Sequence, residues 1–153
     1  MYEYQQTLLY CYKYLDRTVE EYSRLIDYNA LYSKCREYST AEIASDVLRL
    51  ICDKNTLSFV KEKMDEVLSK LNEEDRLFLK IRYYYGKTEN DVYSKGRYYR
   101  KNAKLLFKLF IKFNLAGLNE KFFKENCMHI PLFSEVYLKV NGREKMRKFC
   151  VGG

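Results

Sequence analysis

The segment from residue 97 to residue 114 limits the fold more than any other part of this chain, because its side chains form two sets at a helical repeat. At roughly 100° of rotation per residue, the apolar set occupies one arc of about 80° and the basic set an opposite arc of similar width. The apolar set is Tyr99, Ala103, Leu106, Phe110 and Phe113, and the basic set is Arg97, Lys101, Lys104, Lys108 and Lys112. The pattern predicts one long helix with a core-facing side and a basic ridge. The apolar side is widened by Leu105, Phe107, Leu109 and Ile111, which predicts that the C-terminal half of this helix is largely buried.

A similar periodicity runs through residues 3–36. Apolar side chains recur there at spacings of three, four or seven, which predicts one or two long helices. They are Tyr4, Leu8, Cys11, Leu15, Tyr22 and Leu25. A stripe of this kind fits either the core face of a helical bundle or the seam of a homodimer, and the sequence leaves both alternatives open.

Capping residues predict where helices begin in the middle of the chain. Ser39 and Glu42 form the Ser-x-x-Glu pattern of a capping box, so we expect a helix from there to about residue 52. Asn55 or Thr56 is the expected cap of the next helix, because both side chains can accept a hydrogen bond from a free backbone N–H group.

Asn72 and Asn119 are the expected caps of two further helices, for the same reason. Three carboxylates follow Asn72, where the helix dipole favours negative charge. That helix is expected to end at Gly86, since glycine suits the left-handed conformation at a helix end. A very short helix is expected to open at Thr88, before the long basic helix.

The C-terminal region gives two conflicting signals. Residues 136–140 alternate in type and precede Asn141-Gly142, a favoured two-residue turn, which predicts a small β-hairpin over 135–149. Residues 144–149 are equally compatible with a helix. Pro131 is expected to end any helix that precedes it.

Together these elements predict an all-α protein. We expect a helical bundle that contains a helix-turn-helix-like unit of three helices, with the small hairpin at its end. The regions are a helical N-terminal part (1–70), the helix-turn-helix-like part (71–114) and a C-terminal extension (115–153). A chain of 153 residues is also compatible with one continuous domain.

The positive charge is concentrated in one part of the chain. The net charge is +7, and residues 95–112 hold seven basic side chains and no acid. Residues 1–70, by contrast, hold ten basic and twelve acidic side chains. Such a concentration is typical of a surface that faces phosphate groups. The other interpretation is a solvated helix face in a lysine-rich protein.

Three short motifs occur in order between residues 71 and 101. Leu71-Asn72-Glu73-Glu74-Asp75-Arg76 is followed by Ile81-Arg82-Tyr83-Tyr84-Tyr85-Gly86-Lys87-Thr88, and then by Gly96-Arg97-Tyr98-Tyr99-Arg100-Lys101. This arrangement resembles region four of bacterial sigma factors and of related sigma-like phage regulators. In that family, a Leu-x-x-x-x-Arg helix leads into an Arg-Tyr/Phe-x-x-Gly-Lys-Ser/Thr turn and then a recognition helix. The resemblance covers about 71–110, and this chain is shorter than the family pattern between its two glycines.

The resemblance implies binding of double-stranded DNA and regulation of transcription, with RNA polymerase or another protein as a further partner. Side chains at the start of the recognition helix are expected to reach base edges or phosphates, and those one or two turns later to contact phosphates. A helix N-terminus at Lys87 and Thr88 suits a phosphate as well. The complete set of expected DNA contacts is Lys87, Thr88, Lys95, Arg97, Tyr98, Arg100, Lys101, Lys104 and Lys108.

Other function classes find little support in the sequence. No run reaches the roughly 18 apolar residues of a transmembrane helix, and the N-terminus lacks the features of a secretory signal. We therefore expect no membrane partner, a cytoplasmic location and reduced thiols at the five cysteines. Cys127, His129 and Cys150 lack metal-site spacing, so no metal or other cofactor is expected. No catalytic constellation is recognisable, so we expect no enzyme.

The alternative function is a non-catalytic protein-interaction module. In that interpretation, the basic face of a helical bundle docks an acidic protein partner. Duplex binding in the presence of salt distinguishes the two functions, because a protein-docking bundle should have little affinity for DNA at about 150 mM salt.

Overall fold

The structure is a computed structural model of the chain and describes residues 2–32, 40–86 and 95–151. All regular secondary structure in these ranges is helical, which confirms the predicted all-α class. The chain forms two compact units, residues 14–62 and a larger unit of residues 1–13 together with 63–153. Within the described ranges, no helix has the length and apolar character needed to cross a membrane.

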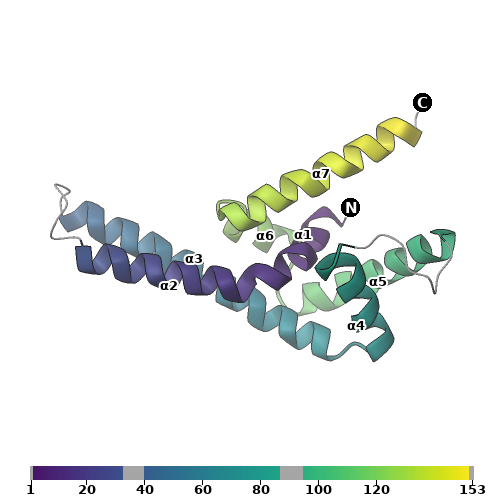
Figure 1. Ribbon diagram of the computed structural model, residues 1–153, viewed down its shortest axis with the longest axis horizontal. Helices are drawn as coiled ribbons and strands as arrows, with labels where there is room; N and C mark the ends of the chain where they lie inside the picture. Colours follow the sequence, from purple (N-terminus) through teal and green to yellow (C-terminus); the bar gives the residue numbers. More distant parts are fainter. Residues whose placement is uncertain (1, 33–39, 87–94, 152–153) are drawn as a thin grey trace. The chain divides into compact units, whose positions relative to one another are not determined.

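The unit of residues 14–62 is a pair of antiparallel helices. Its members, α2 (Leu15–Tyr32) and the first part of α3 (Thr40–Ser69), lie side by side (Figure 1). Asp16, near the start of α2, forms an ion pair with Lys61 of α3 at 3.7 Å. Leu15 and Leu57 are fully buried, so the burial of apolar side chains holds the two helices together in addition to this ion pair.

The expected break in the middle of α3 is not present. A cap at Asn55 or Thr56 is wrong, because α3 is continuous from Thr40 to Ser69. The Thr56 hydroxyl instead donates to the carbonyl of Cys52, one turn earlier, at 3.1 Å. A threonine can satisfy its hydroxyl inside a helix in this way and need not cap one. Ser39 of the expected capping box lies outside the described residues.

The larger unit is built around the N-terminal helix α1 (Glu3–Cys11). It packs against α7 (Pro131–Val151) and α5 (Lys95–Leu115). The Gln5 amide donates to the carbonyl of Leu106 at 2.8 Å, so a buried polar side chain ties α1 to α5. These contacts place residues 1–13 in one unit with 63–153, and the unit boundaries differ from the predicted division near Leu71.

The apolar stripe of residues 3–36 serves as core at its start. Tyr4, Leu8, Cys11 and Leu15 are at most 3% exposed within the chain. Leu25, by contrast, is 45% exposed. The first part of the stripe is therefore a core face, as in the bundle alternative, and a short 3₁₀ turn, η1 (Tyr12–Tyr14), separates α1 from α2.

Three local predictions are confirmed in the larger unit. The side chain of Asn72 accepts from the backbone N–H of Asp75 at 2.8 Å and begins α4 (Glu73–Leu79). Asn119 accepts from the N–H of Phe122 at 2.7 Å and begins α6 (Glu120–Asn126). Gly86 adopts a φ of 69° after the last helical turn, a conformation that glycine reaches without steric cost. Between α4 and Gly86, the backbone forms a π-helical turn, η3 (Lys80–Tyr84).

The predicted C-terminal β-hairpin is wrong, because residues 131–151 form the single helix α7. Pro131 is its first residue, a position where the missing N–H costs nothing. Phe133, Tyr137 and Val140 follow at helical spacing, and Phe133 and Val140 are almost fully buried. The Tyr137 ring lies 5.6 Å from that of Phe123 in α6. Burial of this helical face outweighs the local preference of Asn-Gly for a turn.

Helix α5 has the predicted length, but its buried face is turned relative to the prediction. Tyr98, Asn102, Leu105, Leu106, Leu109 and Phe113 are buried. Tyr99 and Phe110, expected in the core, are 36% and 37% exposed. The expectation of a largely buried C-terminal half is also wrong, since Phe107 and Ile111 are 59% and 49% exposed.

Asn102 explains part of this rotation. Its side-chain oxygen accepts from the Tyr83 hydroxyl at 2.9 Å in a buried position. A polar residue that satisfies its hydrogen bonds can face the core, so an arc drawn through apolar residues alone is misplaced. The short element expected between Gly86 and α5 falls on 87–94, outside the described residues, and the helix-turn-helix stays a prediction.

Candidate nucleic-acid interface

The N-terminal half of α5 exposes three cations on one face. Arg97, Arg100 and Lys104 are exposed, and their spacing of three and four residues places them on the same side of the helix. The Arg100 guanidinium donates back to the carbonyl of Gly96 at 3.3 Å, which directs it along the first turn. These three residues are hereafter called the α5 basic face.

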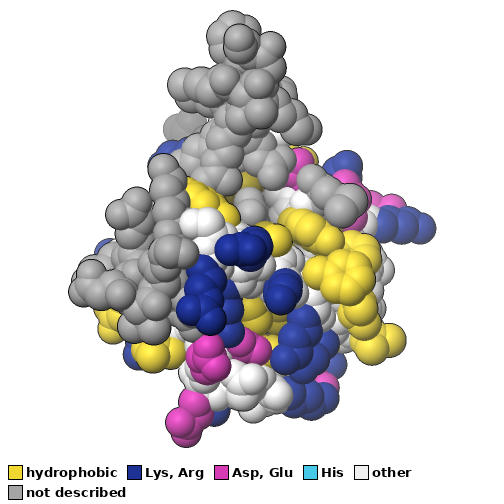
Figure 2. Space-filling view, turned by 90° about the vertical axis from the view of Figure 1, so that its right-hand side faces the viewer, with side chains coloured by type: hydrophobic (Ala, Val, Ile, Leu, Met, Phe, Trp, Pro, Cys, Tyr) yellow, Lys and Arg dark blue, Asp and Glu magenta, His cyan; other side chains and the backbone are white. Residues whose placement is uncertain are grey.

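A shallow hollow of about 360 Å³ lies against this face. It is lined by Glu74, Arg97, Arg100, Lys101 and Lys104. Figure 2 shows Lys and Arg side chains gathered on one face of the molecule, beside a smaller number of carboxylates. Four cations around one hollow make it suited to an anion, and the carboxylate at its edge gives the site a polar boundary.

Lys101 and Lys108 are not part of the α5 basic face, because their ammonium groups are hydrogen-bonded to Asp75. The Asp75 carboxylate accepts from Lys101 at 3.0 Å and from Lys108 at 3.3 Å, and Lys101 also reaches Glu74 at 3.2 Å. Burial of Asp75 acts to raise its pKa, but the hydrogen bonds and charges of the two lysines outweigh burial and lower the pKa below its ordinary value. Asp75 therefore stays ionised and holds both ammonium groups in place.

The prediction that Tyr98 contacts DNA is wrong. Its side chain is 1% exposed, and its ring lies 5.0 Å from that of Phe78 in α4. The Arg82 guanidinium also packs over it, 5.3 Å from the ring centroid. Tyr98 therefore holds α5 against α4 and η3, because an aromatic ring enclosed in this way has no face left for a base.

The remaining predicted contacts lie partly outside what the structure describes. Lys87 and Thr88 fall in 87–94, which is not described. Lys95 is the first residue of α5, and its side chain is not described. The described part of the predicted site therefore consists of the α5 basic face and the two lysines bound to Asp75.

Glu74 and Asp75 are site residues that sequence reasoning assigned only to helix capping. Their contacts with α5 bridge 26 to 33 positions along the chain. Opposite charges on two neighbouring helices were visible in the sequence, but the pairing depends on how α4 and α5 pack. The spacing of residues within one helix does not predict how two helices pack.

Two of the described cysteines are shielded from reaction by burial. The Cys11 and Cys127 thiols are buried, and burial raises both pKa values, that of Cys127 to about 12. No group of three or more metal-binding side chains occurs in the described part of the chain.

The chain was also compared with known proteins. No family model matches it, and neither a curated protein nor a solved structure matches it.

Proposed function

We propose that this chain binds double-stranded DNA through the α5 basic face and thereby regulates transcription. The observation that carries the proposal is the exposure of Arg97, Arg100 and Lys104 on one side of the first turns of α5. Supporting it is the similarity of residues 71–110 to sigma region four, in which a basic helix follows a Gly-Lys-Ser/Thr turn.

The geometry of α5 suits the major groove. An α-helix with its side chains is about 10–12 Å wide, close to the roughly 12 Å width of that groove. Arg97 and Arg100 each present a planar guanidinium that can donate two hydrogen bonds to a guanine edge or to a phosphate. Lys104, one turn later, is suited to a backbone phosphate, which fixes register without reading sequence.

The lysines bound to Asp75 serve a different purpose in this proposal. Lys101 is already hydrogen-bonded to two carboxylates, so a phosphate must compete with them. We assign Lys101 and Lys108 to positioning α5 on α4, with the exposed cations free to meet the duplex. Three exposed cations predict a modest electrostatic contribution, with a slope of log affinity against log salt of about −3 from this face.

Alanine substitution tests the proposal. Arg97→Ala/Arg100→Ala should lower duplex affinity about tenfold or more in fluorescence anisotropy, because each arginine contact is worth about 1–3 kcal/mol. Lys121→Ala/Lys139→Ala removes the same charge from exposed positions on α6 and α7 and serves as the matched control. An equal loss of duplex affinity in both variants would show that only the net charge of the chain matters. No loss of affinity in either variant would exclude DNA binding by this helix.

A second function is favoured by the C-terminal half of α5, where the face that carries the basic residues becomes apolar. Phe107, Ile111 and Leu115 are 59%, 49% and 84% exposed, which is unusual for three large apolar residues on one helix. A protein-docking module would use this apolar row together with the neighbouring cations to bind an acidic partner. Phe107→Ser/Ile111→Ser separates the functions, because it should leave duplex affinity within about twofold if DNA meets only the basic face.

A further inference from the structure

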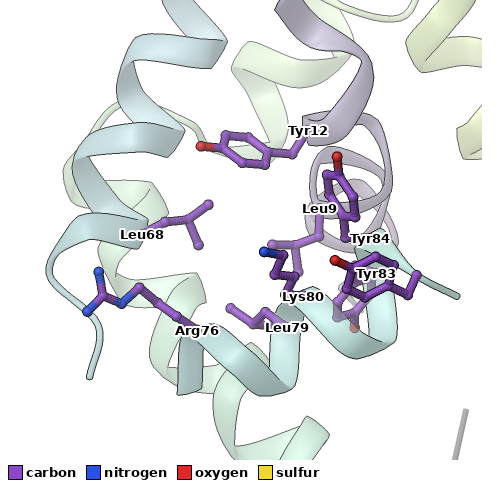
Figure 3. Close-up of a pocket in the computed structure, with 9 residues that line it drawn as sticks. Leu9, Tyr12, Leu68, Arg76, Leu79, Lys80, Tyr83 and Tyr84 are labelled. Atoms are coloured by element: carbon purple, nitrogen blue, oxygen red, sulfur yellow. The ribbon is translucent and has the colours of Figure 1, made fainter. Parts of the chain in front are cut away.

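A cavity of about 410 Å³ in the larger unit shares no lining residue with the basic hollow. Its floor is apolar and formed by buried side chains, since Leu9, Leu79 and Tyr83 are 6%, 5% and 2% exposed. Leu68 of α3 and Tyr12 of η1 form its walls (Figure 3). The volume lies within the roughly 300–1,000 Å³ typical of small-molecule sites.

Two cations, Arg76 and Lys80, line this cavity at its edge. Arg76 and Lys80 are exposed, and neither forms an ion pair with any other described residue. Asp65, a carboxylate of the adjacent stretch of α3, accepts a hydrogen bond from the Tyr12 hydroxyl. The cavity therefore combines an apolar floor with a positively charged edge that the described chain does not neutralise.

The π-helical turn η3 creates part of this arrangement. The Tyr85 N–H donates to the Lys80 carbonyl at 3.0 Å, an i to i+5 bond that widens the turn. Tyr84 and Tyr85 then lie on either side of Lys80. The Lys80 ammonium is 6.0 Å from the centre of the Tyr84 ring and 5.9 Å from that of the Tyr85 ring. Single π-turns are rare and frequently occur at functional sites. The aromatic rings keep the cation at the cavity edge without removing its charge.

We propose that this cavity binds a small amphipathic anion with an aromatic body and one carboxylate or sulfonate group. The aromatic body fills the space above Leu9, Leu79 and Tyr83, where burial of apolar surface drives binding. The anionic group meets Arg76 and Lys80 at the edge, in charge-assisted hydrogen bonds. A purely apolar ligand leaves the two cations without a partner, and an inorganic anion leaves the apolar floor unfilled. The proposal does not depend on DNA binding.

Two fluorescent probes test it on the full-length chain. The aromatic sulfonate 8-anilinonaphthalene-1-sulfonate should bind saturably, with one site per chain. Arg76→Gln/Lys80→Gln should weaken that binding about tenfold, because charge-assisted hydrogen bonds are lost. N-Phenyl-1-naphthylamine has a similar aromatic body without the sulfonate, and its affinity should change less than about twofold in this variant. Lys121→Gln/Lys139→Gln is the control of equal charge.

Two further variants locate the binding. Leu68→Trp fills the cavity and should abolish binding of both probes, provided that the circular dichroism spectrum and unfolding midpoint match those of the unaltered chain. Phe107→Ser/Ile111→Ser alters the exposed apolar row of α5 and should change neither affinity. If Leu68→Trp does not fold, the comparison of the two probes in Arg76→Gln/Lys80→Gln tests the proposal by itself. The proposal is overturned if the unaltered chain shows no saturable binding, if Arg76→Gln/Lys80→Gln affects both probes alike or neither, or if only the α5 variant removes binding.

Discussion

The Asp75 carboxylate accepts a hydrogen bond from Lys101 at 3.0 Å and thereby ties the first turn of α4 to the basic helix α5. The side chain of Asp75 is 9% exposed and that of Lys101 is 22% exposed, so this pair is better shielded from water than the ion pairs on the outer helix faces. It fixes one side of α5 while Arg97, Arg100 and Lys104 remain exposed.

Asp75→Asn should destabilise the larger unit, because it leaves Lys101 and Lys108 without their shared carboxylate. We expect a loss of about 1 kcal/mol in the free energy of unfolding at pH 7, measured by urea denaturation. Since the pKa of Asp75 is lowered on folding, its contribution is present above the unfolded value of about 4 and is lost as the pH falls further. The difference between the two chains should therefore shrink in acid; a difference that persists unchanged below that range would contradict the assignment.

The same substitution should strengthen DNA binding. Removing the carboxylate frees Lys101 and Lys108 to meet phosphate, so duplex affinity should rise several-fold and its salt dependence should steepen by up to about 2 units. Anisotropy titrations of the folded variant at two salt concentrations measure both quantities. Weaker binding by a folded Asp75→Asn chain would instead show that the ion pair itself shapes the DNA-binding surface.

Tyr83→Phe should cost about 1–2 kcal/mol of unfolding free energy, because the buried Asn102 oxygen loses its donor. Burial raises the pKa of Tyr83 to about 12, although the positive charge of Arg82 acts to lower it. Its contribution is therefore complete below the unfolded value of about 10 and is lost as the pH rises through 12. Thermal unfolding should show a steeper alkaline loss in the unaltered chain than in Tyr83→Phe. Tyr84→Phe, at a 45% exposed position, is the control and should have little effect.

Cysteine reactivity tests the packing of α1 and the region after α6. In a Cys35→Ser/Cys150→Ser chain, only exposed Cys52 should react rapidly with a thiol reagent, while Cys11 and Cys127 should react only on unfolding. Burial raises both pKa values and removes the reactive thiolate. Rapid reaction of two or three thiols in the folded chain would contradict the burial of Cys11 and Cys127.

Sequence reasoning succeeded where a single short-range interaction decides the structure. Asn72 and Asn119 each cap a helix because their side chains reach an N–H group three residues later. Gly86 has the expected positive φ for an equally local reason. The same reasoning failed for Asn141-Gly142, where the local turn preference lost to the burial of Phe133 and Val140.

The candidate site could be predicted only in part, because its geometry depends on contacts between helices. The basic residues of α5 are evident in the sequence, but their exposure depends on which side of the helix meets α4, η3 and α1. Asn102 turns that side toward Tyr83, which buries Tyr98 and leaves Arg97 and Arg100 exposed. The pairing of Asp75 with Lys101 and Lys108 is likewise a result of packing.

The salt dependence of duplex binding tests the central claim most directly. For the unaltered chain, log affinity plotted against log salt should have a negative slope with a magnitude of at least about 3. The triple variant Arg97→Ala/Arg100→Ala/Lys104→Ala should lower that magnitude by about 3 units. The Lys121→Ala/Lys139→Ala control should leave the slope near its original value. An unchanged slope in the triple variant, or no duplex binding by the unaltered chain at about 50 mM salt, would contradict DNA binding by α5.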